Sequence, residues 1–103
     1  MIDLIKDRQE QIVSACRRLG VCRLDVFGSA ARGNFTPGKS DIDFVADFDM
    51  QNPAGSFLTR YLTLATELER LLGRPVEIIT PRSMRNPYFR DSVNASRDLV
   101  YAA

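Results

Sequence analysis

The residues best suited to chemistry in this sequence are two aspartates separated by one apolar residue, Asp41-Ile42-Asp43. On a β-strand, residues two apart project from the same face, about 6.6 Å apart along the chain, so the two carboxylates would point the same way. Carboxylates this close repel each other and raise the pKa of at least one of them, which a bound divalent cation relieves. Oxygen ligands without His or Cys favour Mg²⁺ or Mn²⁺. The alternative is that the pair forms the solvent face of an edge strand.

A second feature is the Gly28-Ser29 pair, which follows a predicted strand and precedes a short predicted helical turn. Backbone amides at such a turn can face a phosphate, the glycine permits close approach, and the serine adds a hydroxyl donor. Arg32 is placed to offer a guanidinium fork to the same anion. The alternative is a structural turn in which Gly28 and Gly33 supply unusual dihedral angles. A phosphate-binding turn beside a carboxylate pair is a stronger indication than either feature alone.

A third acid from a neighbouring strand would complete a metal site, and Glu77 is the natural candidate because it is the acid of the predicted strand 76–79. If that strand pairs beside the strand of Asp43, the two carboxylates meet on one face; otherwise Glu77 is a lone exposed glutamate. Asp47 is a poorer choice, since it lies about 13 Å from Asp43 along an ideal strand. Asp25, on the first predicted strand, stays a further candidate.

The composition excludes several other kinds of active site and partner. The 103 residues include no histidine, which excludes His-based triads and the usual zinc hydrolase sites. Two cysteines make neither a disulfide framework nor a zinc site. Fourteen basic and thirteen acidic residues leave a formal charge of +1, so direct nucleic-acid binding is not expected. No apolar run approaches the ~20 residues of a membrane helix and no signal-peptide pattern is visible, so we expect a cytoplasmic protein without a membrane partner.

The elements that must position these groups fit one domain over residues 1–103. Apolar spacing predicts a helix over 3–19, and alternation predicts strands over 22–27, 41–48 and 76–79, with a final edge strand over 99–101. Asn52-Pro53 predicts the start of a long helix, and a short one is expected within 83–95, starting at Asn86-Pro87. The predicted apolar seam of the long helix comprises Leu58, Leu62, Ala65, Leu68 and Leu72. This order predicts an α/β (α+β) fold with helices on one face of a small sheet.

The tail of the chain interleaves basic and aromatic residues: Arg82, Arg85, Arg90 and Arg97 with Tyr88 and Phe89. Such a mixture could contact RNA or an acidic face of a partner. Asp91 and Asp98 lie among them, which favours a solvated helix face.

The combined pattern resembles a known signature. An apolar residue followed by Gly-Ser, then eleven residues (30–40), then Asp-apolar-Asp-apolar is similar to the motif of the DNA polymerase beta-like nucleotidyltransferase superfamily. The fuller string GSAARG…KSDIDFVADFD resembles its minimal branch, the MNT or MntA-type proteins, which are single-domain partners of HEPN-domain toxins in prokaryotic toxin–antitoxin pairs. The motif covers residues 27–45, and looser agreement extends over most of the chain.

This resemblance implies a polymerase beta palm-like fold, a small mixed sheet with flanking helices, and an activity in which AMP passes from ATP to a tyrosine hydroxyl of the paired HEPN-type toxin. It implies two Mg²⁺ ions at the strand ends. The implied site comprises Asp41, Asp43 and Glu77 as catalytic and metal-binding residues, with Gly28, Ser29, Arg32 and Ser40 at the nucleotide. One departure is Glu77, where the family usually has Asp; the extra methylene moves the carboxylate by on the order of an ångström, which bears on activity rather than fold.

Chain length limits the acceptor. A templated polymerase needs further domains to hold its nucleic acid, so we expect a protein acceptor that brings its own binding surface. The alternative functions are a non-catalytic antitoxin that neutralises its partner by direct contact, and a regulatory nucleotide-binding domain. A homodimer and a hetero-oligomer with the partner both stay open.

Overall fold

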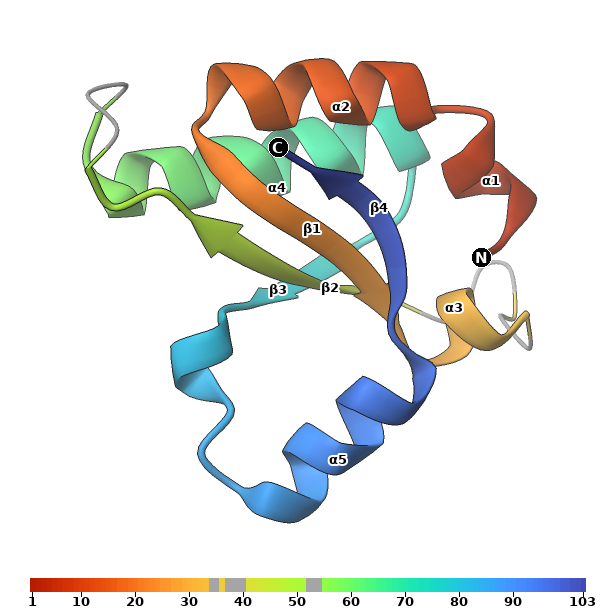
Figure 1. Cartoon of the computed structure of the whole chain (residues 1–103). Helices are drawn as coiled ribbons and strands as arrows, with labels where there is room; N and C mark the ends of the chain where they lie inside the picture. The colour runs from red at the N-terminus through yellow and green to blue at the C-terminus, as the bar shows by residue number, and fades with distance from the viewer. Residues whose placement is uncertain (34–35, 37–40, 52–54) are drawn as a thin grey trace.

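Four strands form one mixed sheet in the order β3-β2-β1-β4 (Figure 1). The computed structural model describes residues 1–33, 36, 41–51 and 55–103. The strands are β1 (Val21–Phe27), β2 (Ile42–Phe48), β3 (Val76–Ile79) and β4 (Asp98–Ala102). β1 is antiparallel to both β2 and β4, whereas β2 and β3 run parallel. The predicted mixed sheet is therefore confirmed.

Helices lie on both sides of this sheet. In Figure 1, α1 (Asp3–Lys6), α2 (Gln9–Arg18) and α4 (Phe57–Leu72) lie above the strands, and α5 (Pro87–Ser96) lies below them. Two short helical segments, α3 (Ser29–Arg32) and η1 (Pro81–Ser83), follow β1 and β3. The prediction that helices cover one face is wrong for α5, because Val93 of α5 joins Phe27 and Val45 in a second, smaller core.

The predicted helix over 3–19 is broken in two. Asp7 and Arg8 separate α1 from α2, and Arg8 has non-helical angles (φ −112°, ψ 9°). The break lets Ile5 of α1 and Ile12 of α2 both reach the main core while the amide of Ile2 donates to the carbonyl of Ala30. The N-terminal segment is thereby attached to α3.

The long helix differs from its prediction in both start and face. Asn52-Pro53 lies outside the described residues, and α4 begins at Phe57, where the Ser56 side chain accepts the amide of Thr59. Leu58 and Leu62 of the predicted seam are exposed (62% and 54%). Arg60 takes the buried place instead, because its guanidinium donates to the carbonyls of Leu19, Gly20 and Asp49. Leu64, Leu68 and Leu72 continue the buried side.

Alternation along β2 decides which face can carry a site. Ile42, Phe44 and Ala46 are buried in the main core beneath α2 and α4. Because successive strand residues point to opposite faces, Asp43 and Asp47 project to the other side, the side of α5. The predicted strand 76–79, the α5 start at Asn86-Pro87 and the final strand are confirmed.

Candidate functional site

Two of the predicted acids meet on adjacent strands. Asp43 of β2 and Glu77 of β3 are direct partners in the parallel register. Directly paired residues share a face, so both carboxylates project from the side of the sheet opposite α2 and α4. Asp41 lies one residue before β2 begins and is exposed, as is Glu77, while Asp43 is half-buried.

The electrostatics of Asp43 show that these three acids influence one another. Burial raises the pKa of the Asp43 carboxyl, and the nearby charges of Glu77 and Asp41 raise it further. Among the described residues, no Lys or Arg forms an ion pair with Asp43. Within residues 1–33, 36, 41–51 and 55–103, the negative charge of the site is therefore uncompensated, and a bound cation would relieve it.

Gly28 closes the site from the end of β1. Its backbone has φ 70° and ψ −147°, and a Cβ atom added there would lie 3.2 Å from the Asp43 carboxylate oxygen Oδ2. A side chain is thus disfavoured both by the backbone angles and by the close approach of the carboxylate. Gly33, at the end of α3, also has a positive φ of 87°. Both glycines have the unusual dihedral angles that the sequence left as an alternative, and Gly28 also leaves room for the Asp43 carboxylate.

The amide of Gly28 already has an acceptor, which the sequence did not reveal. It donates to the side-chain oxygen of Ser96, at the end of α5, over 3.0 Å. Ser96 lies 68 residues away along the chain, so no local pattern could signal the contact. A phosphate at this turn would therefore rely on Ser29 rather than on the Gly28 amide.

The remaining predicted nucleotide-binding residues are distributed around the same turn. Ser29 begins α3 directly after Gly28, and Arg32 ends α3 and is exposed. Ser40 lies outside the described residues. The structure thus places Ser29 beside Gly28, with Arg32 one helical turn further on.

Asp25, the further acidic candidate, forms a separate structural ion pair. It is fully buried on β1, and its oxygen Oδ2 accepts hydrogen bonds from the Nε atoms of Arg97 (2.9 Å) and Arg23 (3.0 Å). A second Arg97 nitrogen also donates to this oxygen. Two arginines compensate this carboxylate, so it is not part of the acidic site.

The donor set fits a hard divalent cation. Asp41, Asp43 and Glu77 offer carboxylate oxygens only, which suits Mg²⁺ or Mn²⁺. Within the described residues, no three acidic, Cys or His side chains already converge as a closed metal-binding group. The fit therefore rests on the Asp43–Glu77 pairing and on the charge repulsion that raises the pKa of Asp43.

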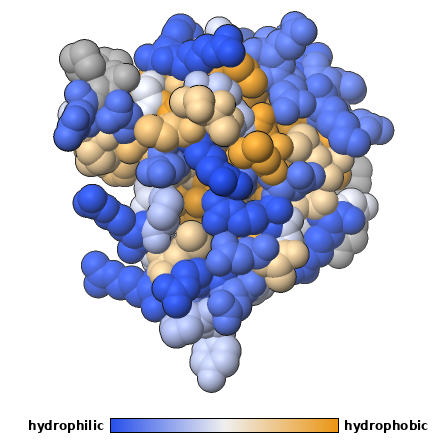
Figure 2. All heavy atoms as spheres, viewed as in Figure 1, coloured by the Kyte–Doolittle hydropathy of each residue, from blue (hydrophilic) through white to orange (hydrophobic). Residues whose placement is uncertain are grey.

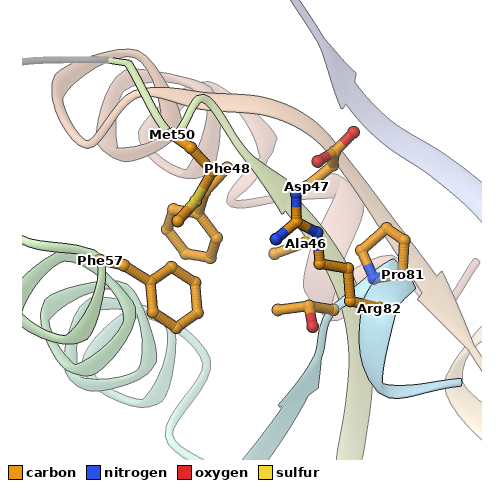
Figure 3. A pocket seen from close by; sticks show the side chains of 8 residues that line it. Ala46, Asp47, Phe48, Met50, Phe57, Pro81 and Arg82 are labelled. Atoms are coloured by element: carbon orange, nitrogen blue, oxygen red, sulfur yellow. The ribbon is translucent and has the colours of Figure 1, made fainter.

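A separate cavity of about 530 Å³ lies toward the other end of β2 (Figure 3). Asp47 lines this cavity with Phe48, Phe57 and Arg82, and Figure 3 shows the side chain of Arg82 reaching toward Asp47. Asp47 is thus remote from the Asp43–Glu77 pair, as its sequence spacing predicted.

Comparison with known proteins gives a consistent result. The family model "Nucleotidyltransferase domain" matches residues 9–100. A Methanocaldococcus jannaschii protein named "Putative protein adenylyltransferase MJ1379" is 45% identical over 76 residues, which cover 74% of this chain and 71% of that protein. A second protein of the same organism, "Putative protein adenylyltransferase MJ0435", is 33% identical over 86% of this chain and 89% of its own length.

Solved structures agree in fold. One described as a "putative minimal nucleotidyltransferase" has a TM-score of 0.76 and 33% identity, covering 93% of this chain and 92% of its own. A tri-AMPylated Shewanella oneidensis HEPN toxin in complex with an MNT antitoxin gives a TM-score of 0.61 at 16% identity, over 96% of this chain and 73% of that one. At that identity the likeness concerns the fold alone. Separately, none of the helices within the described ranges is long and apolar enough to cross a bilayer.

Proposed function

Because this chain belongs to the nucleotidyltransferase domain family, as a minimal nucleotidyltransferase of the polymerase beta-like superfamily, we propose that it transfers AMP from ATP to a hydroxyl of a partner protein. The proposed acceptor is a tyrosine of an HEPN-type toxin, and the chain is the antitoxin of that pair. The observation that carries the proposal is the Asp43–Glu77 pairing beside Gly28, which gathers acidic oxygens next to a Gly-Ser turn. We further propose that the reaction takes place in the cytoplasm, where ATP is supplied.

In the proposed reaction, the tyrosine oxygen forms a bond to the α-phosphorus of ATP while the bond to pyrophosphate breaks. Glu77, exposed on the edge strand, accepts the tyrosine proton. The hydroxyl of Ser29 donates a hydrogen bond to the departing pyrophosphate, and the guanidinium of Arg32 donates to the same anion. Asp41, Asp43 and Glu77 would hold divalent cations, and the chemistry that Mg²⁺ or Mn²⁺ supplies when bound is neutralisation of the triphosphate charge. Positioning and charge stabilisation account for most catalysis of this type, which suits a small scaffold.

The test uses labelled ATP, Mg²⁺ and the protein encoded beside this chain in its genome. We expect label on that protein, and a loss of about a hundredfold or more in Asp41→Asn and Asp43→Asn, the scale on which one electrostatic stabiliser acts in a preorganised site. The matched control is Asp47→Asn, because Asp47 is exposed on the same strand and lines the remote cavity. Its activity should equal that of the unmodified chain.

Two results would contradict the enzyme assignment. If the partner protein is inhibited equally by the unmodified chain, Asp41→Asn and Asp43→Asn, without label transfer, the chain is a binding antitoxin. If ATP binds but neither transfer nor inhibition occurs, it is a nucleotide-binding regulator. Glu77→Asp addresses the family departure directly: transfer should persist in this variant and fail in Glu77→Gln, because only the former keeps a proton-accepting carboxylate.

A further inference from the structure

The segment that follows β3 and continues into α5, residues 81–92, is exposed over most of its length. Between Pro81 and Ser92, Met84 is the one buried residue. Tyr88 is 86% exposed and Phe89 43% exposed, although both are large aromatic residues. Large exposed aromatic side chains are typical of sites where a partner binds. We name Arg85, Tyr88, Phe89 and Arg90 the α5 surface.

Helix α5 is held to the rest of the fold mainly through its C-terminal half. Val93 is its one buried residue, Ser96 accepts the Gly28 amide, and Arg97 directly after it binds Asp25. At the other end, the Asn86 side chain caps the helix by accepting the amides of Tyr88 and Phe89. A ten-residue helix is marginal on its own in water, so the attached half supports an N-terminal half that is exposed apart from the contact of Phe89 with Phe27.

The α5 surface is positively charged. Within the described part of the chain, the side chains of Arg85 and Arg90 make no hydrogen bond or ion pair, whereas that of Arg97 is engaged with Asp25 and Asn94. Figure 2 shows that the lower part of the molecule, where α5 lies in Figure 1, is covered mainly by hydrophilic side chains. These two cations outnumber the one exposed acid beside them, Asp91, which leaves the surface complementary to an acidic ligand.

The α5 surface also lies beside the proposed site. The Phe89 ring contacts the Phe27 ring edge-on, with centroids 6.3 Å apart. Phe27 is the β1 residue that pairs with Asp43, and Gly28 follows it. A ligand on the α5 surface would therefore lie within a few residues of the carboxylates.

We propose that the α5 surface binds an acidic segment of the acceptor protein and so presents its hydroxyl group to the site; this inference rests on the proposed function. An acidic peptide fits better than a nucleic acid for two reasons. A phosphate backbone carries charge along its whole length and would be repelled by Asp41, Asp43 and Glu77 where it continued across the sheet, whereas a short acidic segment can end at the α5 surface and place only its neutral hydroxyl group near these carboxylates. In addition, α5 has ten residues, a length of about 15 Å, which matches a short peptide segment.

The test measures binding first, without relying on transfer. A fluorescent peptide of about twelve residues, made of glutamates around one tyrosine, is titrated against the full chain, and its lysine counterpart serves as the charge control. We expect the acidic peptide to bind more tightly, and Arg85→Glu/Arg90→Glu to weaken it roughly tenfold, which corresponds to about 1.4 kcal/mol. Binding should also weaken as the salt concentration is raised to physiological ionic strength, where the Debye length shortens to about 8 Å.

The matched control is Arg8→Glu/Arg17→Glu, which makes the same charge change on exposed residues of the opposite side of the sheet. This control should bind the acidic peptide like the unmodified chain, and both double variants should unfold cooperatively. In the transfer assay, Arg85→Glu/Arg90→Glu should raise the KM for the partner protein while leaving the KM for ATP unchanged.

Three outcomes would overturn the inference. Equal weakening by both double variants would show a general charge effect, and equal binding of the acidic and lysine peptides would remove charge as the basis. Tighter binding of a single-stranded RNA, lost in Arg85→Glu/Arg90→Glu, would assign the surface to nucleic acid. Absence of AMP transfer by the unmodified chain would contradict the proposed function, whereas unchanged transfer kinetics in the α5 variant would contradict only this inference.

Discussion

Asp25 and Asp43 lie on the same face of neighbouring strands, yet their surroundings are opposite. Asp25, fully buried, receives hydrogen bonds from Arg23 and Arg97. Asp43 is half-buried and lies beside Glu77 and near Asp41; burial raises its pKa, and both neighbouring charges raise it further. A buried charge that serves the fold must be paired, whereas a charge that binds a ligand stays uncompensated until the ligand arrives. The contrast separates a structural aspartate from the one to which we assign a function, within one small sheet.

The same substitution should therefore have opposite effects at these two positions. Asp25→Asn leaves Arg97 beside a neutral partner, and we expect the free energy of unfolding to fall by about 3 kcal/mol, the scale of breaking a buried ion pair. Urea unfolding followed by circular dichroism measures this loss. A change below about 0.5 kcal/mol, the range of ordinary surface substitutions, would show that the pair is not structural.

The hydrogen bond from the Gly28 amide to the Ser96 side chain connects α5 to the site, beside the neighbouring Arg97–Asp25 ion pair. Ser96→Ala removes the acceptor of the partly buried Gly28 amide, so we expect a loss of about 1 kcal/mol. For a chain of this size that corresponds to a melting temperature lower by roughly 4–8 °C. Ser96→Thr keeps a hydroxyl and should retain most of the stability. If both variants melt like the unmodified chain, the hydrogen bond contributes nothing.

Asp43→Asn should stabilise the metal-free protein at pH 7, although we expect it to lower transfer by about a hundredfold or more. Removing the charge relieves repulsion from Glu77, and cross-strand pairs of this kind contribute up to about 1 kcal/mol. Chemical denaturation in the presence of EDTA measures the gain. Destabilisation instead would mean that the charged carboxylate supports the fold, and the contrast with Asp25 would be lost.

The stabilisation by Asp43→Asn should depend on pH. The pKa of Asp43 is raised in the folded state, so the folded chain binds more protons than the unfolded chain. The stability of the unmodified protein therefore decreases as pH rises from the unfolded aspartate pKa of about 3.9 through the raised folded value. Stability curves of the two proteins should coincide at the acidic end of this window and diverge above it. A difference independent of pH would assign the effect to packing.

Several expectations were met because their causes are local. The β2 alternation, the Pro-bounded β3 and the Asn86 cap of α5 follow from periodicity and turn chemistry within a few residues. The predicted buried face of the long helix was wrong for a non-local reason. Leu58 and Leu62 fit the helical period, but Arg60 displaces them from the buried side by binding carbonyls at the end of α2 and after β2.

The sequence by itself determined the chemical inventory of this protein: a Gly-Ser turn, two aspartates at strand spacing, a third acid on a separate strand, and no histidine. Only the tertiary structure decided that Glu77 pairs with Asp43, that two arginines neutralise Asp25, and that Ser96 holds the Gly28 amide. The physical reason is the separation along the chain over which each kind of interaction acts. Strand spacing and turn propensity act between near neighbours, whereas register and charge pairing join residues as distant as Asp25 and Arg97, 72 positions apart, where many arrangements satisfy the same local pattern.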